Sequence, residues 1–169
     1  SFERHLAPGA PVVRAMPNTP AAIGRGMTVC VANAAAGEPR RALATALLAA
    51  VGGGGWGDDE ALMDAVTAVS GSGPAYVFLL AEALAAAGRA QGLDAALADR
   101  LARATVSGSG ELLLQSSDDA AQLRRNVTSP GGTTAAALEV LMREGDGMAS
   151  LLAEAVAAAT KRGRELAGG

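Results

Sequence analysis

Aromatic side chains are almost absent from this chain of 169 residues, which contains one Trp, one Tyr and two Phe. Hydrophobic residues nevertheless make up 50% of the sequence, so the core must be built from Ala, Leu and Val. A chain of this length buries a substantial core. Because Ala-rich helices pack with their backbones close together, the composition predicts a mainly helical protein with a large helix–helix interface.

Cysteine and histidine are equally scarce, since Cys30 and His5 each occur alone. A single cysteine excludes an internal disulfide, and the two residues offer no cluster with zinc-site spacing. His5 lies in a polar segment near the N-terminus, and the flanking sequence holds no acid–base partner for it. We therefore expect no metal site, and a Ser-His-Asp mechanism is disfavoured.

Positive charge is also in short supply. The formal net charge is −3 and the isoelectric point is about 5.1, and basic residues form short pairs such as those at 124–125 and 161–162. No basic stripe is available to neutralise phosphates, which argues against a nucleic-acid partner. No apolar run approaches the ~20 residues that span a bilayer, and the first residues show no signal-peptide pattern. We expect a soluble, cytoplasmic chain with no membrane partner.

Residues 1–57 differ in pattern from the rest of the chain. Apolar runs at 11–17 and 26–32, bounded by Pro and Gly, are typical of strands, and a helix is predicted over 38–51. A sheet of two or three strands is too small to be stable with both faces covered. This segment is therefore interpreted as the C-terminal end of a larger α/β domain.

The glycine run at 52–57 formally fits the dinucleotide-binding pattern G-x-G-x-x-G. That pattern requires a strand before it and a helix after it whose N-terminus holds the pyrophosphate. Here a helix precedes the run, and Asp58, Asp59 and Glu60 would put carboxylates where phosphates bind. We reject the nucleotide-binding interpretation and predict a flexible connection with a short strand near Trp56.

From residue 58 onward the sequence predicts helices only. Asp94 is the expected N-cap of the longest central helix, and the glycines and serines at 70–73 predict a turn with exposed amides before Pro74. The predicted helices cover 58–69, 74–90, 94–115, 117–125 and 146–166.

The segment 126–134 interrupts this helical pattern. Ser129 or Thr128 is the expected N-cap of the next helix and Pro130 suits its first turn, while Gly131 and Gly132 let a ligand approach the main chain. Free N–H groups and the positive end of the helix dipole would then bind a carboxylate or a phosphate. An ordinary capped helix behind a Gly-rich loop is the alternative interpretation.

Three motifs together identify a family. MPNTP at 16–20, DAVTAVSGSGPAY at 64–76 and NVTSPGGTT at 126–134 resemble, in order and spacing, the pyrroline-5-carboxylate reductases. The resemblance implies reduction of 1-pyrroline-5-carboxylate to L-proline by NADPH or NADH. It implies a mostly α fold, in which a helical substrate-binding and dimerisation domain at 58–169 follows the last strands and helix of a Rossmann-type domain at 1–57. No strand–G-x-G-x-x-G–helix unit is present, so we expect the main cofactor site to lie upstream and the isolated chain to be inactive.

The resemblance also implies roles for individual residues. The Thr134 hydroxyl is expected nearest the substrate nitrogen and is the catalytic candidate. Asn126 corresponds to a cofactor-contacting position, and Thr67 is expected to line the same cleft. Glu60 corresponds to a substrate-site position, although an acid at a helix N-terminus explains it equally well. The complete set of substrate-binding candidates is Glu60, Gly131, Gly132, Thr133 and Thr134, and the cofactor-binding candidates are Asn126 and Thr67.

Two other functions stay open at this point. A non-catalytic dimerisation module fits the missing nucleotide-binding unit, and its partner, as for the reductase, would be a second copy in a homodimer or higher homo-oligomer. A hydroxy-acid dehydrogenase of related architecture would generally use a lysine in its helical domain as acid or base. The only lysine is Lys161, near the C-terminus, and this position argues against the dehydrogenase.

Overall fold

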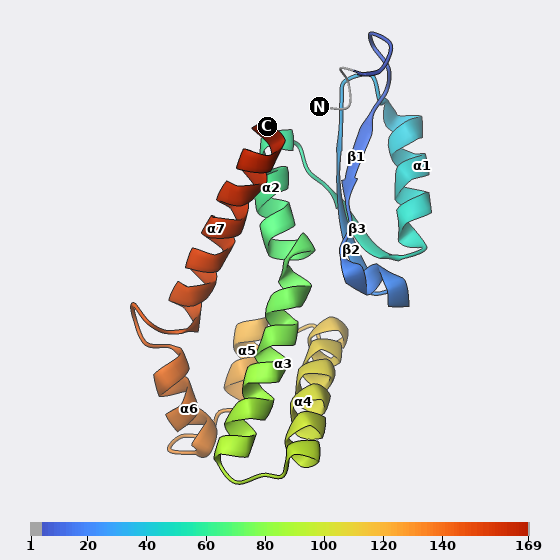
Figure 1. The fold of residues 1–169 in the computed structure, drawn as a ribbon. Helices are drawn as coiled ribbons and strands as arrows, with labels where there is room; N and C mark the ends of the chain where they lie inside the picture. Colours follow the sequence, from blue (N-terminus) through green and yellow to red (C-terminus); the bar gives the residue numbers. More distant parts are fainter. Residues whose placement is uncertain (1–4, 169) are drawn as a thin grey trace. The chain divides into compact units, whose positions relative to one another are not determined.

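The computed structural model describes residues 5–168 (Figure 1). The chain divides into two compact units. The first comprises Ser1–Pro74 together with Ala155–Gly169, and the second comprises Ala75–Glu154. The predicted domain boundary after residue 57 stays a prediction.

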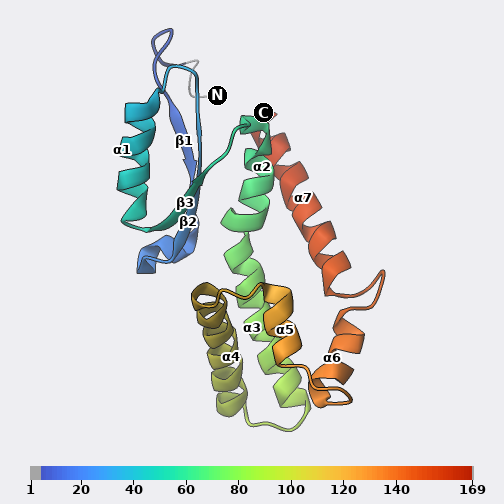
Figure 2. The same ribbon diagram turned by 180° about the vertical axis from the view of Figure 1, so that it is seen from behind.

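The first unit contains a three-stranded sheet in the order β1-β2-β3. β1 (Val13–Met16) pairs antiparallel with β2 (Gly26–Ala32), and β2 pairs parallel with β3 (Gly52–Trp56) through the crossover helix α1 (Glu38–Ala49). Figures 1 and 2 show α1 alongside the strands from opposite sides. The strands and the helix predicted for this segment are confirmed.

The core of this small sheet lies under β2. Thr28 is completely buried and Cys30 is 3% exposed, whereas Met27 between Gly26 and Thr28 is exposed. This alternation is typical of a strand with one face buried, because successive side chains point to opposite faces. Burial raises the pKa of the Cys30 thiol, so the thiol is held in its neutral form.

The glycine run forms strand β3, so the prediction of a flexible connection was wrong, although the short strand near Trp56 is confirmed. The reason is a close approach between Gly52 and Gly26, which are partners in the parallel ladder. Gly52 has φ +142°, and a Cβ there would collide with the backbone of Gly26. Gly26 has no room for a side chain either, because its Cβ would lie 2.8 Å from the Ala21 Cα and from the Val51 carbonyl oxygen.

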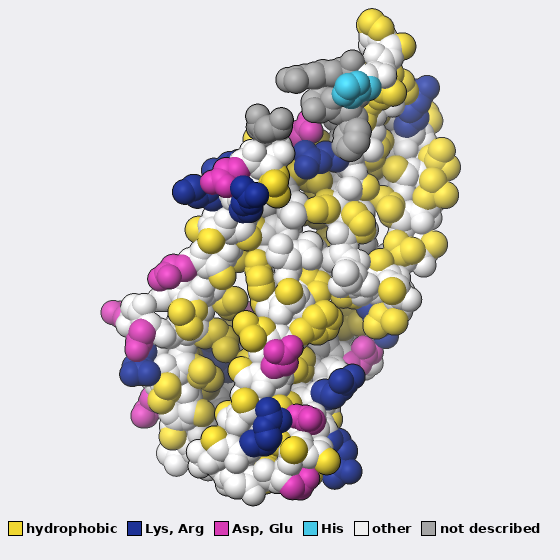
Figure 3. Space-filling view, viewed as in Figure 1, with side chains coloured by type: hydrophobic (Ala, Val, Ile, Leu, Met, Phe, Trp, Pro, Cys, Tyr) yellow, Lys and Arg dark blue, Asp and Glu magenta, His cyan; other side chains and the backbone are white. Residues whose placement is uncertain are grey.

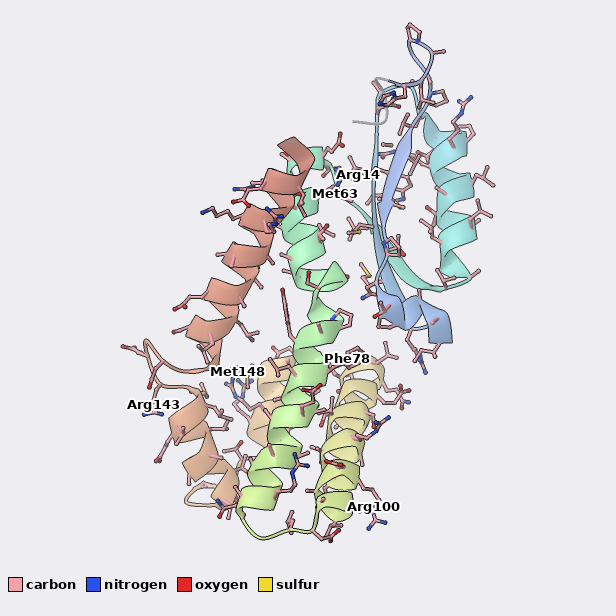
Figure 4. The ribbon with its side chains drawn as sticks, in the orientation of Figure 1. Arg14, Met63, Phe78, Arg100, Arg143 and Met148 are labelled. Carbon is pink, nitrogen blue, oxygen red and sulfur yellow. The ribbon has the colours of Figure 1, made fainter. Side chains whose placement is uncertain are left out.

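A continuous helical segment follows β3. It starts with the short 3-10 turn η3 (Glu60–Leu62) and α2 (Met63–Val66). It then passes through a π-helical turn, η4 (Thr67–Gly71), into α3 (Gly73–Ala90). Met63, 1% exposed, is among the most deeply buried side chains of the first unit and is labelled in Figure 4.

The turn predicted at 70–73 does not break this helix, and the prediction was wrong. The Ser72 N–H instead donates to the Thr67 carbonyl at 2.8 Å, five residues earlier, so the glycines and serines are absorbed into a π-helical turn. Such turns insert one extra residue without ending the helix.

The stretch Glu60–Ala90, of 31 residues, is long and apolar enough, by length and composition, to cross a membrane, since it contains an 18-residue window with a mean hydropathy of 1.3. The expectation that no run of this kind exists was therefore wrong. One such helix is weak evidence for a membrane span, because a helix that packs against another protein has the same composition.

The second unit is helical throughout its regular structure. Asp94 accepts a hydrogen bond from the Leu97 N–H at 3.0 Å and so caps α4 as predicted, and Asp119 caps α5 in the same way through the Gln122 N–H at 2.7 Å. Its helices, besides α3, are α4 (Ala95–Gln115), α5 (Ala120–Asn126), α6 (Thr133–Leu141) and the start of α7 (Met148–Gly168).

Small residues set the distance between α3 and α4. A Cβ on Gly88 would lie 3.2 Å from Leu93 Cδ1 and 3.5 Å from Ala98 Cβ, so the backbone of α3 at Gly88 lies close to the Ala98 side chain of α4. Ala85 and Ala102 are buried in the same unit at 5% and 2% exposure. This close packing agrees with the Ala-rich composition.

Large apolar side chains lie mostly on the surface of the second unit. Phe78 on α3, labelled in Figure 4, is 61% exposed, and the space-filling view shows hydrophobic side chains between the charged ones (Figure 3). Other side chains of this kind are Leu79, Leu101, Leu112, Leu113, Leu114, Val140, Met142 and Leu151.

Candidate functional site

The loop between α5 and α6 begins by closing α5. The Thr128 hydroxyl donates to the Arg124 carbonyl at 2.6 Å, and the Gly132 N–H donates to the Ser129 carbonyl at 3.0 Å. Gly131 has φ +68°, which favours glycine, and a Cβ on Gly132 would collide with the Ser129 hydroxyl. The two glycines are therefore required for different reasons, backbone conformation for Gly131 and space for Gly132.

Helix α6 begins later than the sequence predicts. Its N-cap is Gly132, which makes no side-chain hydrogen bond, and Thr133 is its first residue. The prediction of Thr128 or Ser129 as N-cap, with Pro130 in the first turn, was wrong because these residues form the preceding turns. The first N–H groups of a helix have no partner within the helix, and no side chain caps them here.

This uncapped helix start is what the site offers chemically. Thr133 and Thr134 are the first two residues of α6, so their amides and hydroxyls belong to one helical turn. Unpaired N–H groups and the positive end of the helix dipole together favour an anionic ligand such as a carboxylate. The structure thus brings together the four consecutive candidates from Gly131 to Thr134.

Asn126, the last residue of α5, is held by its own helix. Its Oδ1 accepts from Gln122 Nε2 at 2.6 Å, and its Nδ2 donates to Asp118 Oδ2 at 3.3 Å. These bonds fix its amide beside the start of the loop. Its contact with a cofactor stays a prediction.

Glu60 and Thr67 belong to the first unit, whereas Asn126 and residues 131–134 belong to the second. Glu60 forms an ion pair with Arg14 of β1, labelled in Figure 4, at 3.1 Å between Oε1 and the Arg14 Nη1. Both side chains are substantially exposed, and such pairs stabilise a fold by about 1 kcal/mol at most. The Glu60 carboxylate is therefore able to exchange Arg14 for another partner.

Thr67 starts the π-helical turn. Its hydroxyl donates to the Met63 carbonyl at 2.8 Å, which leaves the oxygen lone pairs and the methyl group for any ligand. The assigned contact of Thr67 with the cofactor stays a prediction, as does the role of Glu60.

Sequence reasoning missed a hydrogen bond that Asn18 makes to a distant part of the sequence. Asn18 is the N-cap residue of the 3-10 helix η2 (Thr19–Ile23). Its side chain makes no capping hydrogen bond to η2. It instead donates to the Ser70 hydroxyl at 3.3 Å, 52 residues away. The presence of Asn18 and Ser70 in two of the recognised motifs was the available signal.

The first unit also contains a cavity of about 80 Å³. It is lined by residues of α1, β2 and β3, including Thr28, Thr45 and Trp56, and contains none of the predicted site residues. The Trp56 indole N–H donates to the Thr45 hydroxyl at 3.1 Å on one side of it. The cavity results from the glycines of β3, which leave the sheet without side chains there.

Comparison with known proteins agrees with the motifs. Residues 60–166 match the family described as pyrroline-5-carboxylate reductase dimerisation. The pyrroline-5-carboxylate reductase of Pseudomonas aeruginosa is 47% identical over 167 residues, which cover 99% of this chain and 60% of that protein. The Synechocystis enzyme of the same name is 49% identical over 159 residues, or 94% of this chain and 58% of that protein.

Solved structures give the same result. A pyrroline-5-carboxylate reductase from Coxiella burnetii superposes with a TM-score of 0.91 and 39% identity, covering 98% of this chain and 60% of that one. The Plasmodium falciparum pyrroline carboxylate reductase, solved with NADP bound, gives a TM-score of 0.83 and 32% identity over 97% of this chain and 65% of that one. The chain thus spans about 60% of the length of the curated relatives it matches.

These matches confirm both the expected fold class, a helical domain preceded by part of a Rossmann-type α/β region, and the resemblance seen in the three motifs. The chain belongs to the pyrroline-5-carboxylate reductase dimerisation family.

Proposed function

We propose that this chain is the substrate-binding and dimerisation part of an NAD(P)H-dependent pyrroline-5-carboxylate reductase, which reduces 1-pyrroline-5-carboxylate to L-proline in the cytoplasm. The observation that carries the proposal is the uncapped start of α6, where two threonines follow a glycine with φ +68°. The substrate is a small cyclic imine with a carboxylate. The helix start offers backbone amides for the carboxylate and a threonine hydroxyl for the ring nitrogen.

The candidate residues have distinct roles in this proposal. The amides of Gly131, Thr133 and Thr134 bind the substrate carboxylate and so fix the ring, while Gly132, whose N–H is bonded to the Ser129 carbonyl, lets the carboxylate approach the main chain. The Thr134 hydroxyl hydrogen-bonds the ring nitrogen, which gains a proton when the adjacent carbon is reduced. Thr133 contributes mainly its N–H, and Glu60 orients the ring nitrogen through water. When bound, the reduced nicotinamide supplies the hydride for the imine carbon.

The cofactor is expected to contact this chain only at its nicotinamide end, through Asn126 and Thr67. The run at 52–57 does not suit a pyrophosphate, because Gly52–Trp56 is a strand and Asp58 and Asp59 follow it. We therefore expect the isolated chain to bind NADPH weakly. Titration of the isolated chain tests this, and micromolar affinity contradicts it.

A second copy of the chain is the proposed partner. In the single chain, Phe78 and many leucines of the second unit are exposed to solvent. Large exposed apolar surfaces mark protein interfaces. A homodimer covers them. The alternative of a purely structural dimerisation module is supported by the same surface and by the absence of a pyrophosphate-binding turn at 52–57.

Reductase assays separate these two functions. The chain is assayed alone and joined to the N-terminal nucleotide-binding part of the Pseudomonas aeruginosa relative, with proline formation and NADPH oxidation measured together. We expect turnover only in the joined protein. A joined protein that is folded, dimeric and binds NADPH but forms no proline contradicts the reductase function and supports the structural module.

A further inference from the structure

The π-helical turn η4 (Thr67–Gly71) needs support from outside its own helix. π-Turns are rare because their hydrogen-bond register is less stable than that of an α-helix, and they occur often at functional sites. Here the Ser72 N–H donates to the Thr67 carbonyl at 2.8 Å. The turn starts with the candidate cofactor contact Thr67, so its register determines where that side chain lies.

Asn18, which is bonded to strand β2, supports the π-helical turn through a hydrogen bond. Its Nδ2 donates to the Ser70 hydroxyl at 3.3 Å, while its Oδ1 accepts from the Met27 N–H of β2 at 2.9 Å. The Met27 N–H is a donor, so it fixes the orientation of the Asn18 amide and directs the NH₂ group toward Ser70. Asn18 is thus anchored on β2 and bonded to η4.

The same turn also packs against the end of β1. A Cβ on Gly71 would lie 3.5 Å from Met16 Cε and 3.4 Å from Thr67 Cγ2, so this position leaves no spare room. Met16 and Asn18 come from the first recognised motif, and Thr67 and Gly71 from the second. Residues about 50 positions apart in the sequence therefore meet at the π-helical turn.

We propose that Asn18 is a positioning residue of the reductase site, which acts through Ser70 to hold η4 in its π-helical register. The inference rests on the proposed function. Without this bond the turn is free to return toward α-helical hydrogen bonding, which displaces Thr67. Asn18 itself touches neither substrate nor cofactor in this role.

Kinetic measurements on the joined protein test the role in catalysis. Asn18→Ala and Ser70→Ala are each expected to lower kcat/KM about tenfold, and the double variant no further than the worse single variant, because both changes remove the same bond. Ser70→Thr keeps the hydroxyl, so this variant is expected to keep the activity that Ser70→Ala loses. Asn33→Ala is the matched control, since Asn33 accepts from the Val12 N–H in the same unit and should affect only thermal stability.

Hydrogen exchange tests, without any assay of activity, whether Asn18 holds the π-helical turn. In the 169-residue chain, exchange of the Ser72 N–H is expected to be about tenfold faster in Asn18→Ala and unchanged in Asn33→Ala. Unchanged exchange at Ser72 overturns the proposal. So do unchanged kcat/KM in Asn18→Ala and single effects that multiply in the double variant. If even the unmodified protein forms no proline, the reductase function fails, and the exchange experiment still decides whether Asn18 holds the turn.

Discussion

The two units of the chain reach stability in different ways. The first unit buries residues of normal core size, including Met63 at 1% exposure and Cys30 at 3%, and its segments are joined by hydrogen bonds from Asn18 and Asn33. The second unit buries small side chains such as Ala98 at 2%, while its large apolar side chains are exposed. The first unit therefore has its own core, whereas many large apolar side chains of the second unit are exposed in the single chain.

This difference has an energetic consequence. Complete burial of a Leu or Phe side chain stabilises a protein by roughly 1.5–3 kcal/mol. The exposed side chains of the second unit do not contribute this free energy in the single chain. A partner that covers Phe78 and its neighbours recovers it. Substitutions in the first unit should thus affect folding of the chain itself, and substitutions on the surface of the second should affect association.

The largest effect is expected from Gly52→Val in the first unit. Gly52 has φ +142°, and any side chain there meets the backbone of Gly26. We expect a loss of roughly 3 kcal/mol or more in the free energy of unfolding, measured by urea denaturation. Gly53→Ala is the control, because its Cβ would lie 3.8 Å from the nearest atom, Met27 Sδ. Equal losses for the two variants would show that the Gly26–Gly52 contact is unimportant.

Phe78→Asp tests the second unit. Phe78 is 61% exposed in the single chain, so the substitution should change the folding of a monomer little. If a second copy covers it, the dimer should weaken by about 2–4 kcal/mol, or roughly 30- to 1000-fold in the dissociation constant, by sedimentation. Leu43→Asp on α1 of the first unit is the control, since Leu43 is 60% exposed. A well-folded unmodified chain that is monomeric at low micromolar concentration contradicts the proposal that a second copy covers the apolar surface of the second unit.

A smaller, pH-dependent effect is expected at Cys30. Burial raises the pKa of its thiol in the folded chain above the unfolded value, so the unfolded state loses its proton first as pH rises. This contribution to stability is complete below the unfolded pKa of about 8.5 and is lost as pH rises toward the folded value. Compared with the unmodified chain, Cys30→Ala should lose less stability between neutral and alkaline pH. Parallel pH profiles for the two proteins would contradict the burial of this thiol.

Local sequence patterns predicted the elements whose ends depend on local chemistry. Gly26–Ala32 is a strand because β-branched residues lie between turn signals, and α4 begins at Ala95 because Asp94 caps it. Three errors involve partners outside the local sequence or competition among neighbours. The glycines of β3 are ordered by β2, the turn expected at 70–73 is a π-helical turn contacted by Asn18, and the Thr128 hydroxyl closes α5 instead of capping α6.

The candidate site was predictable in part. The Gly131–Thr134 helix start could be recognised from glycines followed by threonines, although its N-cap was misplaced by three or more residues. The bond from Asn18 to Ser70 could not, because a contact over 52 residues depends on the tertiary fold. The roles of Glu60, Thr67, Asn126 and Thr134 toward ligands stay predictions.

The central claim is that the start of α6 binds the carboxylate of the imine substrate and hydrogen-bonds its ring nitrogen, and Thr134→Val in the joined protein tests it most directly. Valine keeps the shape of threonine but removes the hydroxyl, whose bond to a charged group is worth roughly 1.5–3 kcal/mol. We expect kcat/KM to fall about ten- to a hundredfold with cofactor affinity nearly unchanged, and Thr133→Val to be milder. A kcat/KM within about twofold of the unmodified protein, or equal damage to cofactor binding and turnover, would contradict the role of the Thr134 hydroxyl.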